Sequence, residues 1–258
     1  MRKPEPILVA HLFAPLHDEL LALLRSLTPD EWNAPTVAGS WTVKDVAAHL
    51  LDTCLRRLSM HRDGYTPSLP FEDLPSFVNG MNASAVEYAR RLSPEVVIDL
   101  HARYGVQQAE FFASLDPCET AKWGVSWAGE EESPMWFDIA RELTERWHHQ
   151  QQIRDAVGRL PLYETYLAPV LDTFVRALPY TYREVSGGPL VLNIEGEGVW
   201  SLVDGTLYSG AAADPVTTVT LEGDKAWRLF TRQKIDPGAR VEGDARLAEP
   251  LLKMTAVV

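Results

Sequence analysis

Cysteine is scarce in this chain of 258 residues, which contains only Cys54 and Cys118. Neither belongs to a Cys-x-x-Cys pair, so a thiolate zinc site and a disulfide-rich scaffold are both excluded. The scarcity of cysteine fits a reducing compartment, and we expect the protein in the cytoplasm.

Long apolar runs and basic charge are also lacking. No stretch approaches the roughly 20 apolar residues that a membrane span requires. The segment after the N-terminus is broken by polar side chains such as His11 and His17, unlike a secretory signal. The chain has 24 basic against 36 acidic side chains, a net charge of −12. Because nucleic-acid binding needs Lys and Arg to neutralise phosphates, we expect neither nucleic acid nor a membrane as a partner.

Several common catalytic motifs are missing as well. The sequence contains no glycine-rich dinucleotide fingerprint, no Walker loop, no Gly-x-Ser-x-Gly elbow and no His-Glu-x-x-His zinc motif. Hydrophobic residues make up 46% and charged residues 23%, ordinary values for a globular protein with one large domain or two small ones. Any chemistry must therefore come from residues that the fold brings together.

The first part of the chain has the apolar periodicity of helices. Thr42, with Asp45 three residues later, predicts a capping box, and a proline-rich loop is expected around Pro67 and Pro70. Four or five long helices are predicted, over about 7–27, 43–62, 73–92, 94–115 and 134–157. Their connections are of moderate length, so we expect an antiparallel four-helix bundle in a first domain, residues 1–160.

Beyond residue 160 the pattern changes to short alternating runs separated by glycines. These predict strands near 190–194, 199–203, 216–221 and 240–244. Helices are predicted near 163–183, 224–232 and 244–254. We therefore expect a second domain, residues 161–258, with a small α+β fold and an antiparallel sheet.

Three side chains predict a metal site. Glu145 and His149 are four residues apart, so on a helix they share one face. His49, about a hundred residues earlier on another predicted helix, can supply a second imidazole. Three such ligands leave a coordination position open, which is typical of a catalytic metal rather than a structural one.

Each feature also has a simpler interpretation. The stripe that contains Glu145 and His149 also contains Asp138, Glu142 and Gln152, and a solvent-exposed polar face would have the same pattern. His49 among apolar neighbours is compatible with a buried histidine that binds no metal. Glu145-x-x-His148 has the spacing of di-iron bundles, but no second such motif exists, so a di-iron centre is not expected.

With these residues identified, the chain resembles the DinB-like, mycothiol-dependent maleylpyruvate isomerase family. The resemblance is carried by residues 40–50 (SWTVKDVAAHL) and 141–158 (RELTERWHHQQQIRDAVG), and by 227–232 (WRLFTR) and 241–248 (VEGDARLA) in the second half. It implies a four-helix bundle that holds a divalent metal, usually zinc, through a histidine on the second helix and Glu-x-x-x-His on the last. Those positions correspond to His49, Glu145 and His149. It also implies that residues 161–258 form a sterol-carrier-like domain.

The resemblance further implies a metal-dependent transferase or isomerase that uses a low-molecular-weight thiol as cosubstrate and a small electrophile as substrate. Zinc is the expected metal, although His/Glu sites also accept nickel, iron or cobalt. The alternatives are a hydrolase that uses metal-activated water and a non-enzymatic protein that binds a small molecule or lipid. Candidate substrate-binding residues are Asn82 and Arg91 on the middle helices, and Trp123 and Trp127 in the irregular 116–133 segment. Other candidates for an arginine that binds an acidic substrate are Arg90, Arg103 and Arg232.

Overall fold

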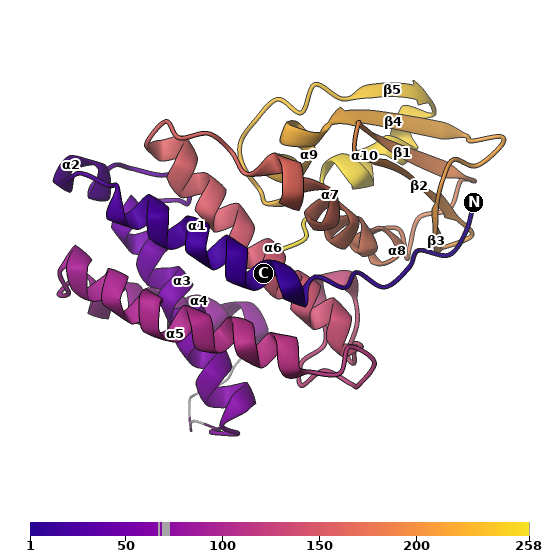
Figure 1. Cartoon of the computed structure of the whole chain (residues 1–258). Helices are drawn as coiled ribbons and strands as arrows, with labels where there is room; N and C mark the ends of the chain where they lie inside the picture. The colour runs from indigo at the N-terminus through magenta and orange to yellow at the C-terminus, as the bar shows by residue number, and fades with distance from the viewer. Residues whose placement is uncertain (67, 69–72, 258) are drawn as a thin grey trace. The chain divides into compact units, whose positions relative to one another are not determined.

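The computed structural model describes residues 1–66, 68 and 73–257. Two compact units are present (Figure 1). We call the first, residues 9–117 and 145–161, the helical unit, and the second, residues 1–8, 118–144 and 162–257, the sheet unit. The domain division at residue 160 stays a prediction. Pro67 and Pro70, where a proline-rich loop was expected, lie outside the described residues.

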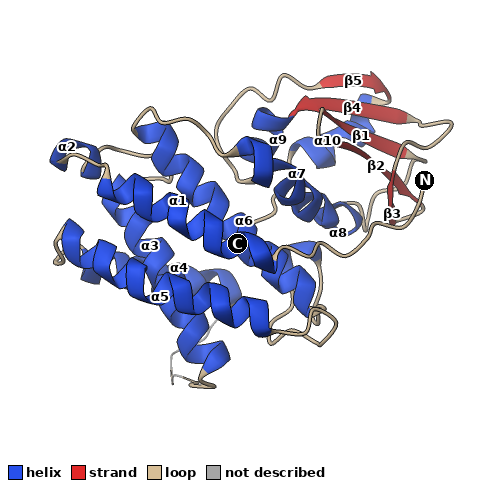
Figure 2. Cartoon of the chain, viewed as in Figure 1, coloured by secondary structure: helices blue, strands red, loops and turns tan. Residues whose placement is uncertain are grey.

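The predicted long helices are present in the first part of the chain (Figure 2). The long helices are α1 (Phe13–Arg25), α3 (Val43–Arg57), α4 (Leu74–Ala89), α5 (Pro94–Ser114) and α6 (Met135–Ala156). Three short elements accompany them: a 3₁₀ turn η1 (Ala10–Leu12), the one-turn helix α2 (Pro29–Trp32) and a π turn η2 (Leu58–Arg62). Helix α6 ends as predicted near Gly158, whose φ of +64° is a conformation that glycine adopts at little cost. The helix α6 continues from the sheet unit into the helical unit.

The start of α3 is held by the capping box that the sequence predicts. The Thr42 Oγ1 accepts a hydrogen bond from the Asp45 backbone N–H at 3.3 Å, and Asp45 Oδ2 accepts one from the Thr42 N–H at 3.1 Å. Arg90, just after α4, donates from Nε and Nη2 to the two Asp45 oxygens at 3.0 and 3.1 Å. This bidentate pair ties the end of α4 to the start of α3.

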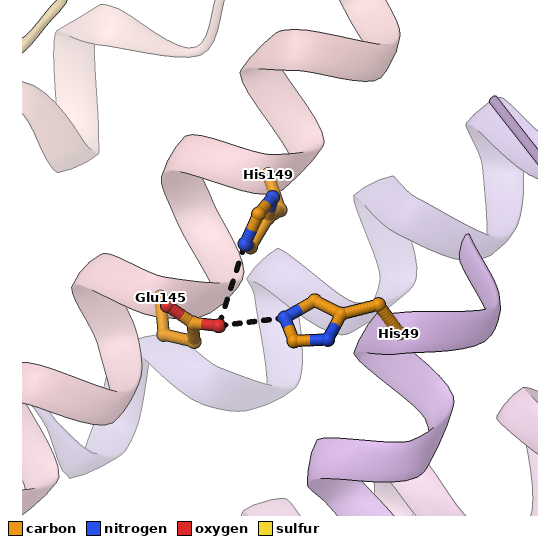
Figure 3. Close-up of side chains that lie close together, drawn as sticks. All are labelled: His49, Glu145 and His149. Atoms are coloured by element: carbon orange, nitrogen blue, oxygen red, sulfur yellow. Dashed lines mark hydrogen bonds and ion pairs between the residues drawn. The ribbon is translucent and has the colours of Figure 1, made fainter. Parts of the chain in front are cut away.

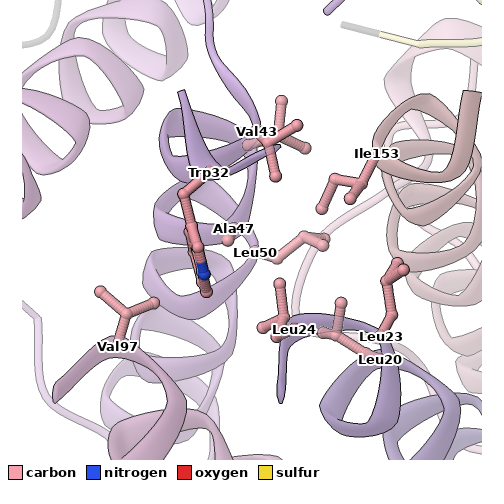
Figure 4. Packing of buried hydrophobic residues seen from close by; sticks show 10 residues of the cluster. Leu20, Leu23, Leu24, Trp32, Val43, Ala47, Leu50, Val97 and Ile153 are labelled. Atoms are coloured by element: carbon pink, nitrogen blue, oxygen red, sulfur yellow. The ribbon is translucent and has the colours of Figure 1, made fainter. Parts of the chain in front are cut away.

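A buried apolar cluster packs the helices of the helical unit together (Figure 4). Leu50 on α3 and Ile153 on α6 are both fully buried in it, next to His49 and one turn beyond His149, respectively. The cluster comprises Leu20, Leu23, Leu24, Trp32, Val43, Val46, Ala47, Leu50, Val97 and Ile153. Because side chains in protein cores are closely packed, this cluster, to which α3 and α6 both contribute, holds the two helices in one arrangement.

The sheet unit contains a five-stranded sheet in the order β3-β2-β1-β4-β5. The strands are β1 (Leu190–Glu195), β2 (Gly198–Val203), β3 (Thr206–Ser209), β4 (Thr217–Glu222) and β5 (Arg240–Gly243). The prediction of an antiparallel sheet needs a correction, because β1 and β4 are parallel and the sheet is mixed. After β3 the chain returns across the sheet and adds β4 on the far side of β1, a placement that local alternation does not encode.

The helices of this unit include one further difference from the sequence prediction. The helix predicted over 163–183 is divided, since Pro179 lacks an N–H and sits at the start of a new short helix. The segments are α7 (Tyr163–Phe174), η4 (Val175–Ala177) and α8 (Leu178–Thr181), and the unit also has η3 (Ser126–Ala128), α9 (Gly223–Phe230) and α10 (Ala245–Leu252). A helical region followed by a small α+β region is the fold class that the sequence predicts. Within the described ranges, no helix is both long enough and apolar enough to cross a bilayer.

Candidate metal centre

His49 lies in the middle of α3, with its side chain almost completely buried. Its Nε2 is 2.8 Å from Glu145 Oε1 on α6 (Figure 3). The same carboxylate oxygen is 3.4 Å from His149 Nε2, one helical turn further along α6. The structure therefore brings together the three side chains that the sequence singles out, from two helices far apart in the chain.

The His149 imidazole is oriented by a second residue of α6. Its Nδ1 lies 2.7 Å from Gln152 Oε1, and because this oxygen only accepts, Nδ1 carries the proton and donates it. That tautomer leaves the lone pair of Nε2 directed at the cluster, as a metal-binding histidine requires. The Trp41 ring packs against both imidazoles, with centroids 5.1 Å from that of His49 and 6.4 Å from that of His149.

The protonation states also suit a cation. Burial lowers the pKa of the His49 imidazole, so at neutral pH the ring is uncharged and can offer a lone pair. Burial alone raises the pKa of the Glu145 carboxyl, but its close contacts with the His149 and His49 imidazoles hold this pKa well below its usual range. Glu145 is therefore ionised, and one negative charge sits between two imidazoles.

The separations fit one bound ion. Two ligand atoms at about 2.0–2.1 Å from a tetrahedral cation lie about 3.4 Å apart. The three donor atoms here all lie within 4.8 Å of one another. In the part of the chain that the structure describes, no other group of three histidine, cysteine, aspartate or glutamate side chains meets in this way. His49, Glu145 and His149 can hold a divalent metal with small side-chain adjustments.

The interpretation of the α6 stripe as a solvent-exposed polar face is wrong. Asp138 is 0% exposed, and Glu142 and Gln152 are each 5% exposed. Leu143 and Trp147 on the opposite side of α6 are buried as well. Polar side chains in such surroundings need partners, which is what His149 and Gln152 provide for each other.

His148 is not a member of the three-residue cluster. Its ring lies against that of His149, with centroids 4.0 Å apart, and its side chain is buried. The Glu145-x-x-His148 spacing therefore does not contribute a second ligand to this group.

The candidate substrate-binding residues from the sequence are divided between the two units. Asn82 accepts a hydrogen bond from Arg56 Nη2 at 2.7 Å, and the Arg91 guanidinium lies 5.3 Å from the centroid of the Tyr88 ring. Trp123 and Trp127 both belong to the sheet unit. Their roles in substrate binding stay predictions.

Contacts of these two tryptophans lie within the sheet unit. The Lys122 Nζ lies 5.4 Å from the centroid of the Trp123 ring, and Trp127 packs edge-to-face against Phe137 and Phe174. Of the arginines considered, Arg90 is engaged by Asp45, and Arg232 has a left-handed backbone with φ of +63°.

Three residues of this region were missed by sequence reasoning. Gln152 was placed on the stripe but not assigned as the partner of His149, although the i, i+3 spacing makes that pairing possible. Trp41 and Arg56 also come close to the site residues. Their involvement depends on tertiary packing, so only their nearness to His49 in sequence could have suggested it.

Comparisons with known proteins agree with the fold described above. Two crystal structures of the mycothiol-dependent maleylpyruvate isomerase have a similar fold, one of them with a histidine-to-alanine substitution. The TM-scores are 0.59 at 15% identity and 0.58 at 14% identity for the substituted form, and each alignment covers 92% of this chain and 91% of the other. No curated protein sequence is significantly similar to this one.

The mycothiol maleylpyruvate isomerase N-terminal domain profile matches residues 13–154. That segment contains His49, Glu145 and His149. Since it covers more than half of the sequence, the chain belongs to the mycothiol maleylpyruvate isomerase N-terminal domain family.

Proposed function

We propose that this protein is a metal-dependent enzyme that activates a low-molecular-weight thiol for attack on a small electrophile, as an S-transferase or a thiol-assisted isomerase. The observation that carries the proposal is the convergence of one ligand atom from each of His49, Glu145 and His149 within 4.8 Å. Three protein donors of this kind leave room for an exogenous ligand, which is typical of catalytic sites.

The residues present would hold the ion and keep it in place. His49 and His149 would each donate through Nε2, and Glu145 would supply the negative charge. A divalent cation bound there, for which we propose zinc, favours the thiolate form of a nearby thiol and so supplies a nucleophile at neutral pH. Gln152 accepts from Nδ1 of His149 and so fixes the orientation of its ring, and His49 is almost completely buried.

The names of the two similar structures support the thiol part of the proposal. Those proteins are described as mycothiol-dependent isomerases, and the chain belongs to the corresponding domain family. At 14–15% identity, the likeness to these structures concerns the fold alone, so we leave the electrophile open rather than transferring maleylpyruvate.

The test is turnover that depends on both thiol and metal. Untagged, zinc-loaded protein is incubated with mycothiol, glutathione or cysteine and an electrophile such as 1-chloro-2,4-dinitrobenzene or maleylpyruvate. We expect product only when thiol and metal are both present, and loss of turnover in His149→Ala. His11→Ala, which changes an exposed histidine outside the cluster, should behave as wild type.

Two results would contradict the proposal. Turnover of a hydrolysable substrate that ignores thiol would indicate a hydrolase on the same scaffold. Thiol transfer that persists after the metal is removed, or in His149→Ala, would show that the activity does not depend on the metal cluster.

A further inference from the structure

An apolar pocket lies in the helical unit, and its lining includes Ala48, the neighbour of His49 in the sequence. Its volume is about 460 Å³, within the range of pockets that bind small organic molecules. Side chains from α3, η2, α4 and α5 line it. The apolar part includes Leu51, Leu55, Met60, Met81, Leu92 and Leu100.

One end of this pocket is polar and contains an ion pair. Arg56 Nε forms an ion pair with Asp52 Oδ2 at 2.7 Å, and Arg56 Nη2 donates to Asn82 Oδ1 at 2.7 Å. Both Asp52 and Arg56 line the pocket. Because Asp52 balances the charge of the Arg56 guanidinium, this pair presents no net charge to a ligand, and the mostly apolar lining favours selectivity through apolar contact.

The pocket and the metal cluster share helix α3. Its lining begins at Ala48, the neighbour of His49. Asp52 and Arg56 follow His49 by three and seven residues, so all three lie on one side of the helix. Along the helix axis, Asp52 is about 4.5 Å and Arg56 about 10.5 Å from His49. The polar end of the pocket therefore lies within one or two turns of α3 from His49.

The rim of the pocket has the composition of a recognition surface. Tyr65 and Tyr88 line it, yet they are 61% and 59% exposed. The Arg91 guanidinium lies over the Tyr88 ring. Exposed aromatic rings at a pocket mouth are typical of ligand sites, and Met60 and Met81 allow the walls to adapt to different shapes.

We propose that this pocket binds the apolar body of the electrophile and places its reactive end toward the His49, Glu145 and His149 cluster. This rests on the proposed function and narrows its substrate class: electrophiles with an aryl group or an alkyl chain, rather than small dicarboxylates.

Direct binding tests the pocket without any catalytic step. The probe is N-phenyl-1-naphthylamine, a neutral aromatic amine whose fluorescence rises in apolar surroundings. Ala85 lines the pocket on α4, whereas Ala83 on the same helix is exposed and does not line it. We expect Ala85→Trp to fill the space and weaken probe binding about tenfold or more, and Ala83→Trp to bind as wild type.

Should Ala85→Trp fail to fold, as judged by circular dichroism, Ser84→Phe on the same lining replaces it. No saturable probe binding by the wild type would overturn the proposal. Equal affinity of wild type and the pocket-filling variant would overturn it as well, because the probe would then be bound elsewhere.

Substrate selectivity separates this proposal from the proposed function. With one thiol and a series of 2-alkenals of growing chain length, kcat/KM should rise about two- to fourfold per methylene in wild type and in Ala83→Trp. In Ala85→Trp the dependence should be flat. Thiol-dependent turnover that ignores chain length in the wild type contradicts the pocket proposal alone. Intact probe binding without any thiol-dependent turnover contradicts the proposed function and leaves the pocket an apolar ligand site.

Discussion

His49 and Glu145 are 96 positions apart in the chain, yet His49 Nε2 and Glu145 Oε1 are 2.8 Å apart. The contact joins α3 to α6, the helices that also contribute the buried Leu50 and Ile153 to the core cluster. Since His149 lies on the same side of α6, this one contact completes a three-residue cluster. The quantities that can be measured are the metal affinity and metal content of the cluster and the free energy of unfolding of the protein.

Gln152 should control metal affinity through His149. Gln152→Leu removes the oxygen that accepts from His149 Nδ1–H, so the ring loses its orientation and we expect metal affinity to fall roughly 10- to 100-fold. Gln152→Glu keeps an accepting oxygen and should lose much less. Competition titration with a chromophoric chelator measures both. Equal affinities of the two variants would show that the hydrogen bond does not support the site.

Gly105 should be intolerant of even one methyl group. A Cβ at this position of α5 would lie 2.0 Å from Cε1 of the buried His17 ring. We therefore expect Gly105→Ala to lower the free energy of unfolding by roughly 1–3 kcal/mol, measured by urea denaturation.

A second helix-interior glycine provides the matched control for Gly105. A Cβ at Gly80 on α4 meets nothing within 4 Å, so Gly80→Ala should raise stability by up to about 1 kcal/mol through helix propensity. Gly105→Ala combined with His17→Ala should recover part of the loss. Destabilisation of the same size in both single variants would point to backbone effects rather than to the His17 contact.

Two buried histidines should make the protein sensitive to acid. Burial and the positive charge of Arg146 lower the pKa of His17 from 6.5 to about 4, and burial lowers the pKa of His101 to about 3. Below pH 6.5 the unfolded chain binds protons at these positions while the folded chain does not. Stability is therefore complete above pH 6.5 and falls toward pH 4, by up to about 1.4 kcal/mol per pH unit for each histidine.

Urea unfolding at a series of pH values measures this loss. His101→Gln removes one titrating group, keeps a donor for the Ala47 carbonyl that His101 Nε2 contacts at 2.9 Å, and should flatten the pH dependence. His11→Gln, at an exposed histidine, should leave the slope unchanged. A slope that His101→Gln does not alter would assign the acid sensitivity to other groups.

The features that sequence reasoning identified are mostly local. The Thr42–Asp45 capping box and the glycine stop after α6 depend on residues within one helical turn, and both are present. The face shared by Glu145 and His149 likewise follows from helix geometry. The resemblance of residues 40–50 and 141–158 to a known family then linked His49 to that pair. Metal binding itself stays a prediction.

The features that sequence reasoning missed depend on long-range packing. The parallel pairing of β1 with β4 requires knowledge of where the chain crosses the sheet. Likewise, the burial of the polar stripe on α6 follows from what surrounds the helix, because its own sequence was also compatible with a solvent-exposed face.

Strand β3 had a local signal that was overlooked. Asp204 and Gly205 both have positive φ, at 48° and 74°, as the turn of a two-residue hairpin requires. The Asp-Gly dipeptide is a strong indicator of such a hairpin, and it would have predicted the pairing of β2 with β3.

The metal content of untagged protein, purified without chelator, tests the central claim most directly. Elemental analysis should find about one equivalent of a divalent transition metal in the wild type and in His11→Ala, and less than about a tenth in His49→Ala and His149→Ala. Wild-type protein with less than about a tenth of an equivalent after zinc is supplied and excess removed, or His49→Ala and His149→Ala variants that keep their metal, would contradict the account.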